Sequence, residues 1–128
     1  MQHLFFIAIG GSIGALSRYT LSRYIGQTAN DLFPYGTLLV NVAGSFLIGF
    51  FFEIFNRSVI SSDLKSLITI GFLGAFTTFS TYTLETVNLF RDNEIKMGVL
   101  NIVYNNSLAI LFLIIGIYFS KVILKIIR

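Results

Sequence analysis

The sequence predicts an all-α membrane protein with four transmembrane helices in each subunit. Of its 128 residues, 55% are hydrophobic and 12% are charged, and the mean hydropathy is +0.80. Charged residues make up about a quarter of an ordinary soluble domain, so a water-soluble fold is excluded. A membrane helix needs about 20 residues, so this length accommodates four spans and leaves no room for a separate catalytic domain.

Four apolar segments occupy about residues 4–24, 33–55, 64–90 and 97–127, and we expect them to form one transmembrane domain. Short polar breaks separate them at residues 27–31, 56–63 and 91–94, and the first break leads to the sole proline, Pro34. Ser61, Ser62 or Asp63 could cap the third helix, because their side chains can accept from free backbone amides. The first segment shows neither a basic region nor a small-residue cleavage site, so we expect it to remain as a span.

The first span combines small residues with one arginine. Gly10 and Gly14 form a GxxxG pair, and a second pair of small residues, Ser45 and Gly49, follows in the second span. Such pairs allow close backbone contact between helices. Arg18 is expensive at this depth unless it reaches the interface or finds a partner. It could orient a helix or raise the anion concentration at a vestibule.

Polar residues in the second and fourth spans recur at helical spacing. Thr37 and Asn41 are four residues apart, as are Asn101 and Asn105, so each pair shares one helix face. Any one of them could simply join neighbouring helices through hydrogen bonds, but polar groups inside a membrane usually face a partner or a water-filled path. We interpret the aligned pairs as a polar track, which four helices alone can hardly enclose, and therefore expect a homo-oligomer. The polar neighbours of the second pair are Tyr104 and Ser107.

The third span contains poor helix formers at its centre. Residues 71–85 include two glycines, one serine and four threonines, which lower helix propensity. We therefore expect a break that lines a cavity or is buried in protein, where freed carbonyls can coordinate a cation. Phe79, Tyr82 and Glu85 follow at intervals of three and would share a face if the helix resumes there. Alternatively, the rings only pack, and Glu85 is an interfacial carboxylate near Arg91.

Positive charges give only a weak indication of orientation. Four spans place both termini on one side, where the tail and the middle loop carry five cations against three on the other side. Because Lys and Arg bias sets orientation, this split is compatible with insertion both ways or with one orientation set by the tail. Scattered cations are typical of headgroup contacts and do not favour nucleic-acid binding. The first group comprises Lys121, Lys125, Arg128, Arg57 and Lys65, and the second comprises Arg23, Arg91 and Lys96.

Three stretches of the sequence resemble one known family. They are the glycine-rich first span with Arg18 and Tyr19, residues 36–46 (GTLLVNVAGSF), and residues 71–81 (GFLGAFTTFST) followed by Glu85. In this order and at this distance they are similar to the CrcB/Fluc fluoride channels, and the resemblance covers nearly the whole chain.

The resemblance implies an antiparallel, dual-topology homodimer in the prokaryotic inner membrane, with two fluoride pores and a central structural sodium ion. Backbone carbonyls of Gly74 and Thr77 from both subunits would hold the sodium. Asn41 would be the pore asparagine, Phe79 and Tyr82 the paired pore aromatics, and Glu85 the acidic residue of the track. The hydroxyl donors would be Thr37, Ser80 and Thr81, and further candidates for the pore or vestibule are Arg18, Phe76, Asn101, Tyr104, Asn105 and Ser107.

Two departures from the family pattern concern the pore. The second pore aromatic is usually Phe, whereas Tyr82 could add a hydroxyl donor or shift the ring. The fourth-span track usually carries hydroxyl residues, whereas Asn101, Asn105 and Tyr104 stand here. The expected function is export of cytoplasmic fluoride down its electrochemical gradient, since HF enters cells as a neutral acid and dissociates inside. Closely spaced, uncharged hydrogen-bond donors can replace the hydration shell of this small anion.

The main alternative is a proton-coupled cation exporter of the small multidrug class, which is also a four-span antiparallel dimer. That mechanism needs a carboxylate buried in the membrane, yet the first span has no acid, Glu53 sits at the end of the second span, and Glu85 lies past the expected break in the third. A purely structural protein would leave the polar track unexplained. An enzyme is disfavoured, because the sole histidine, His3, has no acidic sequence neighbour and no cysteine is present.

Overall fold

A computed structural model describes residues 2–29 and 31–127 of the chain, almost entirely as helices. The helices are α1 (Gln2–Ala29), α2 (Tyr35–Arg57), α3 (Ser62–Ser66), the π-helix η1 (Leu67–Leu73), α4 (Gly74–Phe76), α5 (Phe79–Arg91) and α6 (Ile95–Ile127). Asn30 of the first polar break and Arg128 of the basic tail lie outside the described residues.

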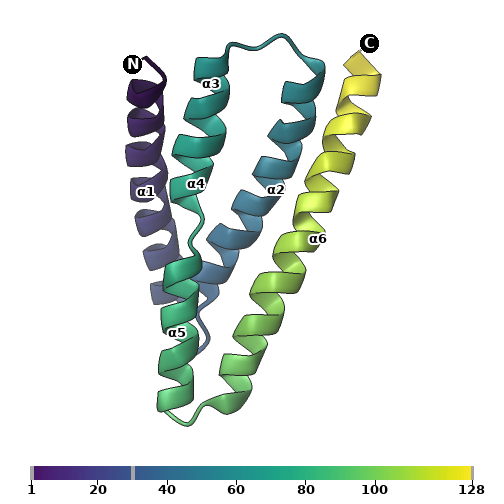
Figure 1. The fold of residues 1–128 in the computed structure, drawn as a ribbon. Helices are drawn as coiled ribbons and strands as arrows, with labels where there is room; N and C mark the ends of the chain where they lie inside the picture. The colour runs from purple at the N-terminus through teal and green to yellow at the C-terminus, as the bar shows by residue number, and fades with distance from the viewer. Residues whose placement is uncertain (1, 30, 128) are drawn as a thin grey trace.

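Four helical segments are long and apolar enough to cross a membrane, as the hydropathy predicted. They are α1, α2, the stretch Ser62–Arg91 that contains α3, η1, α4 and α5, and α6. Figure 1 shows them as a bundle in which α1 lies beside α3 and α4, and α6 lies beside α2, with both ends of the chain at the same end of the bundle. The protein is therefore an all-helical, multi-pass membrane protein.

The first polar break is shorter than predicted. The helix α1 continues through Gln27 and Thr28 to Ala29, where the sequence predicted a loop. Polar side chains do not end a helix by themselves, and the Thr28 hydroxyl donates to the Tyr24 carbonyl within the helix, at 2.8 Å. The next helix begins at Tyr35, directly after Pro34, a residue that favours the first turn of a helix. Of the three candidate caps for the third span, Ser61 is the one that accepts from Leu64 N–H.

The predicted GxxxG pair in α1 does support close backbone contact. A Cβ atom on Gly10 or Gly14 would lie 2.2 Å from the carbonyl oxygen of Leu67 or Phe72, respectively, so only glycine lets α1 approach η1 this closely. Gly49 does the same between α2 and α6, where a Cβ would lie 2.2 Å from the Leu113 carbonyl oxygen.

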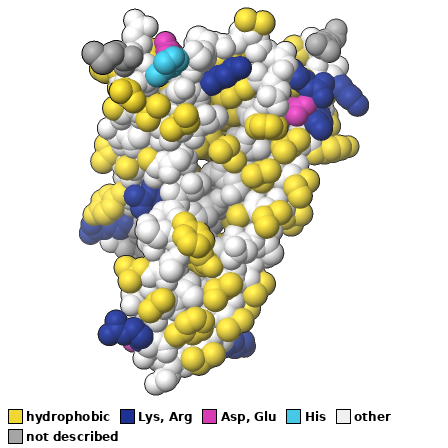
Figure 2. All heavy atoms as spheres, in the orientation of Figure 1, with side chains coloured by type: hydrophobic (Ala, Val, Ile, Leu, Met, Phe, Trp, Pro, Cys, Tyr) yellow, Lys and Arg dark blue, Asp and Glu magenta, His cyan; other side chains and the backbone are white. Residues whose placement is uncertain are grey.

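Most large apolar side chains lie on the outside of the subunit. Figure 2 shows apolar side chains distributed from one end of a face to the other, and few large ones are buried. The buried ones include Val40 on α2, Leu73 on η1, Phe76 on α4 and Tyr82 on α5. An apolar exterior with a small, partly polar interior is the pattern of a subunit surrounded by lipid or by another subunit.

Candidate anion-binding site

Two residues of the third span, Thr77 and Thr78, have extended backbone between α4 and α5. Their φ and ψ angles are −88° and 156°, and −147° and 118°. The Thr78 side chain accepts from Thr81 N–H at 3.1 Å and so caps α5, a position that suits threonine. Extended residues inside a span leave peptide groups without helical partners, and these groups must be satisfied by other means.

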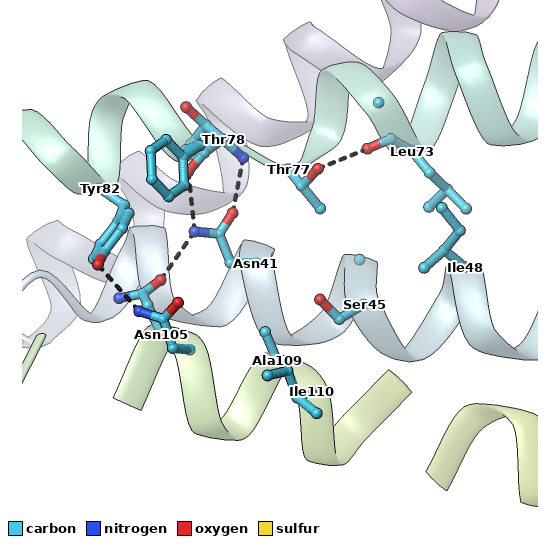
Figure 3. Close-up of a pocket in the computed structure, with 14 residues that line it drawn as sticks. Asn41, Ser45, Ile48, Leu73, Thr77, Thr78, Tyr82, Asn105, Ala109 and Ile110 are labelled. Carbon is cyan, nitrogen blue, oxygen red and sulfur yellow. Dashed lines mark hydrogen bonds between the residues drawn. The ribbon is translucent and has the colours of Figure 1, made fainter. Parts of the chain in front are cut away.

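The side chain of Asn41 on α2 forms hydrogen bonds with both backbone polar groups of Thr78. Its Oδ1 accepts from Thr78 N–H at 2.8 Å, and its Nδ2 donates to the Thr78 carbonyl at 3.0 Å (Figure 3). This pairing explains why an amide is needed here, because a carboxamide offers a donor and an acceptor side by side. Asn41 therefore holds the Thr77–Thr78 segment to α2.

A chain of hydrogen bonds runs from Asn41 through α6 to α5. Asn41 Nδ2 donates to Asn105 Oδ1 at 2.9 Å, and Asn105 Nδ2 donates to Asn101 Oδ1 at 2.8 Å. Asn101 Nδ2 then donates to Thr86 Oγ1 at 2.9 Å, and Thr86 donates to the Tyr82 carbonyl at 2.8 Å. The asparagines predicted to share a face thus bind one another and hold three helices together. The Asn101 side chain is fully buried, and its hydrogen bond to Thr86 agrees with the alternative that it joins neighbouring helices.

A pocket of about 330 Å³ opens beside this chain, between α2, the Thr77–Thr78 segment and α6. Figure 3 shows Asn41 near its middle, with Tyr82 and Asn105 on one side and Ser45 on the other. Figure 2 shows a hollow near the middle of the subunit face. None of the lining side chains carries a charge. The lining residues are Asn41, Gly44, Ser45, Ile48, Leu73, Gly74, Thr77, Thr78, Phe79, Tyr82, Asn105, Asn106, Ala109 and Ile110.

The two aromatics expected on one face both line this pocket but differ in burial. Tyr82 is 9% exposed, whereas Phe79 is 75% exposed on the subunit surface. Their ring centroids are 5.3 Å apart and the rings meet edge to face at 66°. The Tyr82 hydroxyl also accepts from Asn106 Nδ2 at 3.1 Å. The departure from phenylalanine therefore places a hydroxyl group in a polar contact.

Glu85 and Thr37 form a separate polar contact away from the pocket lining. The Thr37 hydroxyl donates to Glu85 Oε1 at 2.7 Å, while the buried Oε2 has no hydrogen-bond partner among the described residues. Within residues 2–29 and 31–127 the structure gives Glu85 no ion pair, so its hydrogen-bonding partner there is Thr37 and not Arg91. The carboxylate faces α2.

Arg18 has a defined partner inside the bundle. Its Nε donates to the carbonyl of Ala75 in α4 at 3.0 Å. This contact joins α1 to the end of α4 beside the Thr77–Thr78 segment. It agrees with the expectation that an arginine at this depth finds a partner.

Backbone carbonyls of Gly74 and Thr77 remain available at the same segment. Thr78 N–H, which would close the next helical turn onto Gly74, instead donates to Asn41, and Thr81 N–H donates to the Thr78 side chain. No donor from the described part of the chain reaches either carbonyl outside the helices. Free carbonyl oxygens of this kind are the ligands that unwound membrane helices offer to monovalent cations.

Several predicted site residues lie away from the pocket. The hydroxyls of Ser80 and Thr81 contact Thr78 Oγ1, at 3.3 and 3.0 Å. Ser107 donates to the Val103 carbonyl of its own helix, at 2.6 Å. The rings of Phe76 and Tyr104 pack against Phe72 and Phe33, respectively.

Three polar residues at the site were not among the predicted site residues. Asn106 and Ser45 line the pocket, and Thr86 completes the hydrogen-bond chain. Ser45 lies four residues after Asn41, so an extension of the helical spacing would have found it. Asn106 follows Asn105 directly. Adjacent residues on a helix point in different directions, so the four-residue spacing that placed Asn101 and Asn105 on one face did not include Asn106. Thr86 had no sequence signal, because its partner lies on another helix.

Comparison with known proteins places the chain in a family. Residues 5–117 match the family described as CrcB-like protein, Camphor Resistance (CrcB). The chain belongs to the CrcB family.

Curated members similar to it carry the name fluoride-specific ion channel FluC, and three illustrate the range of identity. The channel of Shewanella baltica (strain OS185) is 45% identical over 124 residues, and that of Shewanella sp. (strain ANA-3) is 44% identical over 124 residues. The channel of Desulforapulum autotrophicum is 41% identical over 125 residues. The alignments cover 95 to 96% of this chain and 100% of each relative, so the similarity to these CrcB relatives includes all four spans.

Proposed function

We propose that this CrcB family member is a fluoride-selective ion channel. The observation that carries the proposal is identity of up to 45% along the whole length of relatives named fluoride-specific ion channels. The pocket beside Asn41 supports it, because its polar lining consists of amides, hydroxyls and peptide groups without a carboxylate. Neutral donors can replace water around a small anion without holding it so tightly that it cannot leave.

The same pocket disfavours the cation exporter. An exporter needs a carboxylate in the substrate path, but Glu85 binds Thr37 and Glu53 binds Arg57, and neither lines the pocket. A channel, in contrast, does not need a carboxylate that binds and releases protons during transport. The edges of Phe79 and Tyr82 carry the positive part of the ring quadrupole and can face an anion.

The working unit we propose is an antiparallel homodimer. The pocket lies at the subunit surface beside Phe79, whose ring is 75% exposed, so a second copy would complete its wall. The weak charge bias along the sequence is compatible with insertion of the same chain in both directions. Both copies would sit in the prokaryotic inner membrane and release fluoride that accumulates in the cytoplasm after HF dissociates.

A structural sodium ion at the dimer centre belongs to the same proposal. The carbonyls of Gly74 and Thr77 fit such an ion, because no donor outside the helices occupies them within the described chain. Gly74 is exposed, and a Cβ added there would meet nothing closer than the Thr69 carbonyl oxygen at 3.7 Å. A side chain at this position therefore disturbs a partner or a cation without disturbing the packing inside the subunit.

The substitution Gly74→Val tests the cation site without measuring transport. We expect it to shift the protein from dimer to monomer in detergent and to abolish any stabilisation of the wild-type dimer by sodium over N-methylglucamine. The readouts are size-exclusion chromatography with light scattering, and thermal unfolding in the two salts. Val at Gly26, where a Cβ has open space, is the matched control. A Gly74→Val dimer with wild-type stability in sodium would contradict the cation site.

The function itself is tested by anion efflux from liposomes that contain the purified protein. Fluoride and chloride release are followed with ion-selective electrodes while an ionophore clamps the membrane voltage. We expect rapid fluoride release with no chloride release above that of empty liposomes. Absence of fluoride release from verified dimers would refute the channel, and proton-coupled uptake of a quaternary cation would then be measured on the same liposomes.

A further inference from the structure

The Tyr82 hydroxyl is held in place at the edge of the pocket. Asn106 Nδ2 donates to Tyr82 Oη at 3.1 Å, and the Tyr82 side chain is largely buried. The oxygen therefore acts as an acceptor in this contact, which leaves the hydroxyl hydrogen free to point elsewhere. No acceptor for that hydrogen is found among the described residues.

The other amides of the pocket have already used their donors. Both hydrogens of Asn41 Nδ2 have acceptors, the Thr78 carbonyl and Asn105 Oδ1. Asn105 Nδ2 donates twice to Asn101, and Asn106 Nδ2 donates to Tyr82 and to the Ile102 carbonyl. Within the described chain, the side-chain hydrogens of the pocket that remain without an acceptor are the hydroxyls of Tyr82 and Ser45.

We propose that the Tyr82 hydroxyl, positioned by Asn106, donates a hydrogen bond to the fluoride ion in this pocket. This inference rests on the proposed channel function and names the donor that the anion meets. Asn41 then has a different role, since it holds the Thr77–Thr78 segment and becomes a donor to the anion only if its bond to Asn105 opens. Ser45, on the other side of Asn41, is the next donor along the pocket (Figure 3).

The contact with Asn106 makes this hydroxyl a stronger donor. A hydroxyl that accepts one hydrogen bond is polarised and donates the next one more strongly, above all where water is scarce. Hydrogen bonds to an ion are stronger than those between neutral groups, and a small ion with high charge density gains most from them. The pair of Tyr82 and Asn106 therefore favours fluoride over larger halides.

The substitution Tyr82→Phe removes the donor and keeps the ring. We expect fluoride release from liposomes to fall about tenfold, which is the order expected for one hydrogen bond to an ion, and fluoride affinity in calorimetry to fall with it. Tyr118→Phe is the matched control, because the Tyr118 ring is 70% exposed on α6 and lies outside the pocket. It should retain wild-type release.

Asn106 is tested as a positioning residue by a double-variant cycle. Asn106→Leu should weaken fluoride release in the wild-type background and have little further effect on Tyr82→Phe, because its action passes through the hydroxyl. A purely structural role would lower dimer stability equally in both backgrounds. Size-exclusion profiles of all four proteins show whether assembly is retained, and Asn106→Leu carries the test if Tyr82→Phe fails to assemble.

The outcomes separate this inference from the channel itself. Fluoride release that is equal in wild type, Tyr82→Phe and Asn106→Leu would overturn the role of Tyr82 and leave the channel standing. Absence of release from wild type would overturn the channel, and the inference with it. A specific loss in Tyr82→Phe, with Tyr118→Phe unchanged, would support both.

Discussion

Two interfaces of this subunit use opposite means to hold helices together. Between α1 and η1, glycines bring backbones into direct contact, and a Cβ on Gly14 would lie 2.2 Å from the Phe72 carbonyl oxygen. Between α2, α5 and α6, asparagines and threonines join the helices through side-chain hydrogen bonds beside the pocket. At the first interface, a Cβ on Gly10, Gly14 or Gly71 would overlap backbone atoms of the facing helix. The second consists of side-chain hydrogen bonds and borders the pocket, so it is where we place the proposed pathway for the ion.

The largest effect should come from filling the glycine interface. Gly14→Val places a branched side chain against backbone that cannot move aside, so the destabilisation should far exceed the about 1 kcal/mol of an average substitution. We expect no folded dimer by size-exclusion chromatography. Gly26→Val, on the same helix but with open space around its Cβ, should give a normal elution profile. A folded Gly14→Val protein would show that α1 and η1 are less tightly fixed than the contact distances indicate.

The substitution Asn41→Leu should abolish anion flux. It leaves Thr78 N–H and the Thr78 carbonyl without their partner, which costs about 1–3 kcal/mol for each buried group left unsatisfied. We therefore expect lowered thermal stability together with lost fluoride efflux, while the dimer still forms. Asn88→Leu, at an exposed position on α5, controls for replacing an amide by an apolar side chain. Undiminished flux in Asn41→Leu would remove this residue from the functional site.

The substitution Asn101→Leu should have the smallest effect of the three. It removes the bond that Asn101 donates to Thr86 and the bond that its Oδ1 accepts from Asn105, but Asn105 keeps the Asn101 backbone carbonyl as an acceptor and still accepts from Asn41. Stability should fall by about 1–2 kcal/mol, measured by thermal unfolding, and fluoride efflux should fall only a few-fold. A loss of flux as large as that of Asn41→Leu would mean that the ion passes Asn101 and that the two ends of the hydrogen-bond chain are equivalent.

The sequence was most informative where a pattern repeats along one helix. Hydropathy predicted the four spans, and the spacing of Gly10 and Gly14 predicted close backbone contact. The threonine-rich composition drew attention to the centre of the third span, and the extended residues found there are Thr77 and Thr78. The end of α1 was missed by several residues, because polar residues can extend a helix beyond its apolar part.

Contacts between helices could not be predicted in the same way. Nothing in the spacing says that Asn41 pairs with the peptide of Thr78, or that Thr86 receives a bond from Asn101. Such contacts depend on the relative rotation of two helices, which packing of the whole bundle determines. The resemblance assigned Asn41 and Tyr82 to the pore. Only the hydrogen bonds in the structure show that both amide hydrogens of Asn41 have acceptors, whereas the hydroxyl hydrogen of Tyr82 has none among the described residues.

The extended Thr77–Thr78 segment also has an electrostatic consequence. Aligned peptide dipoles give each helix end a partial charge of about half an elementary charge, positive at the N-terminus and negative at the C-terminus. The segment lies between the helical stretch that finishes at Phe76 and α5, which begins at Phe79, so the negative end of the first lies close to the positive end of the second. An uncharged backbone therefore presents opposite polarities within a few residues, one suited to a cation and the other to an anion.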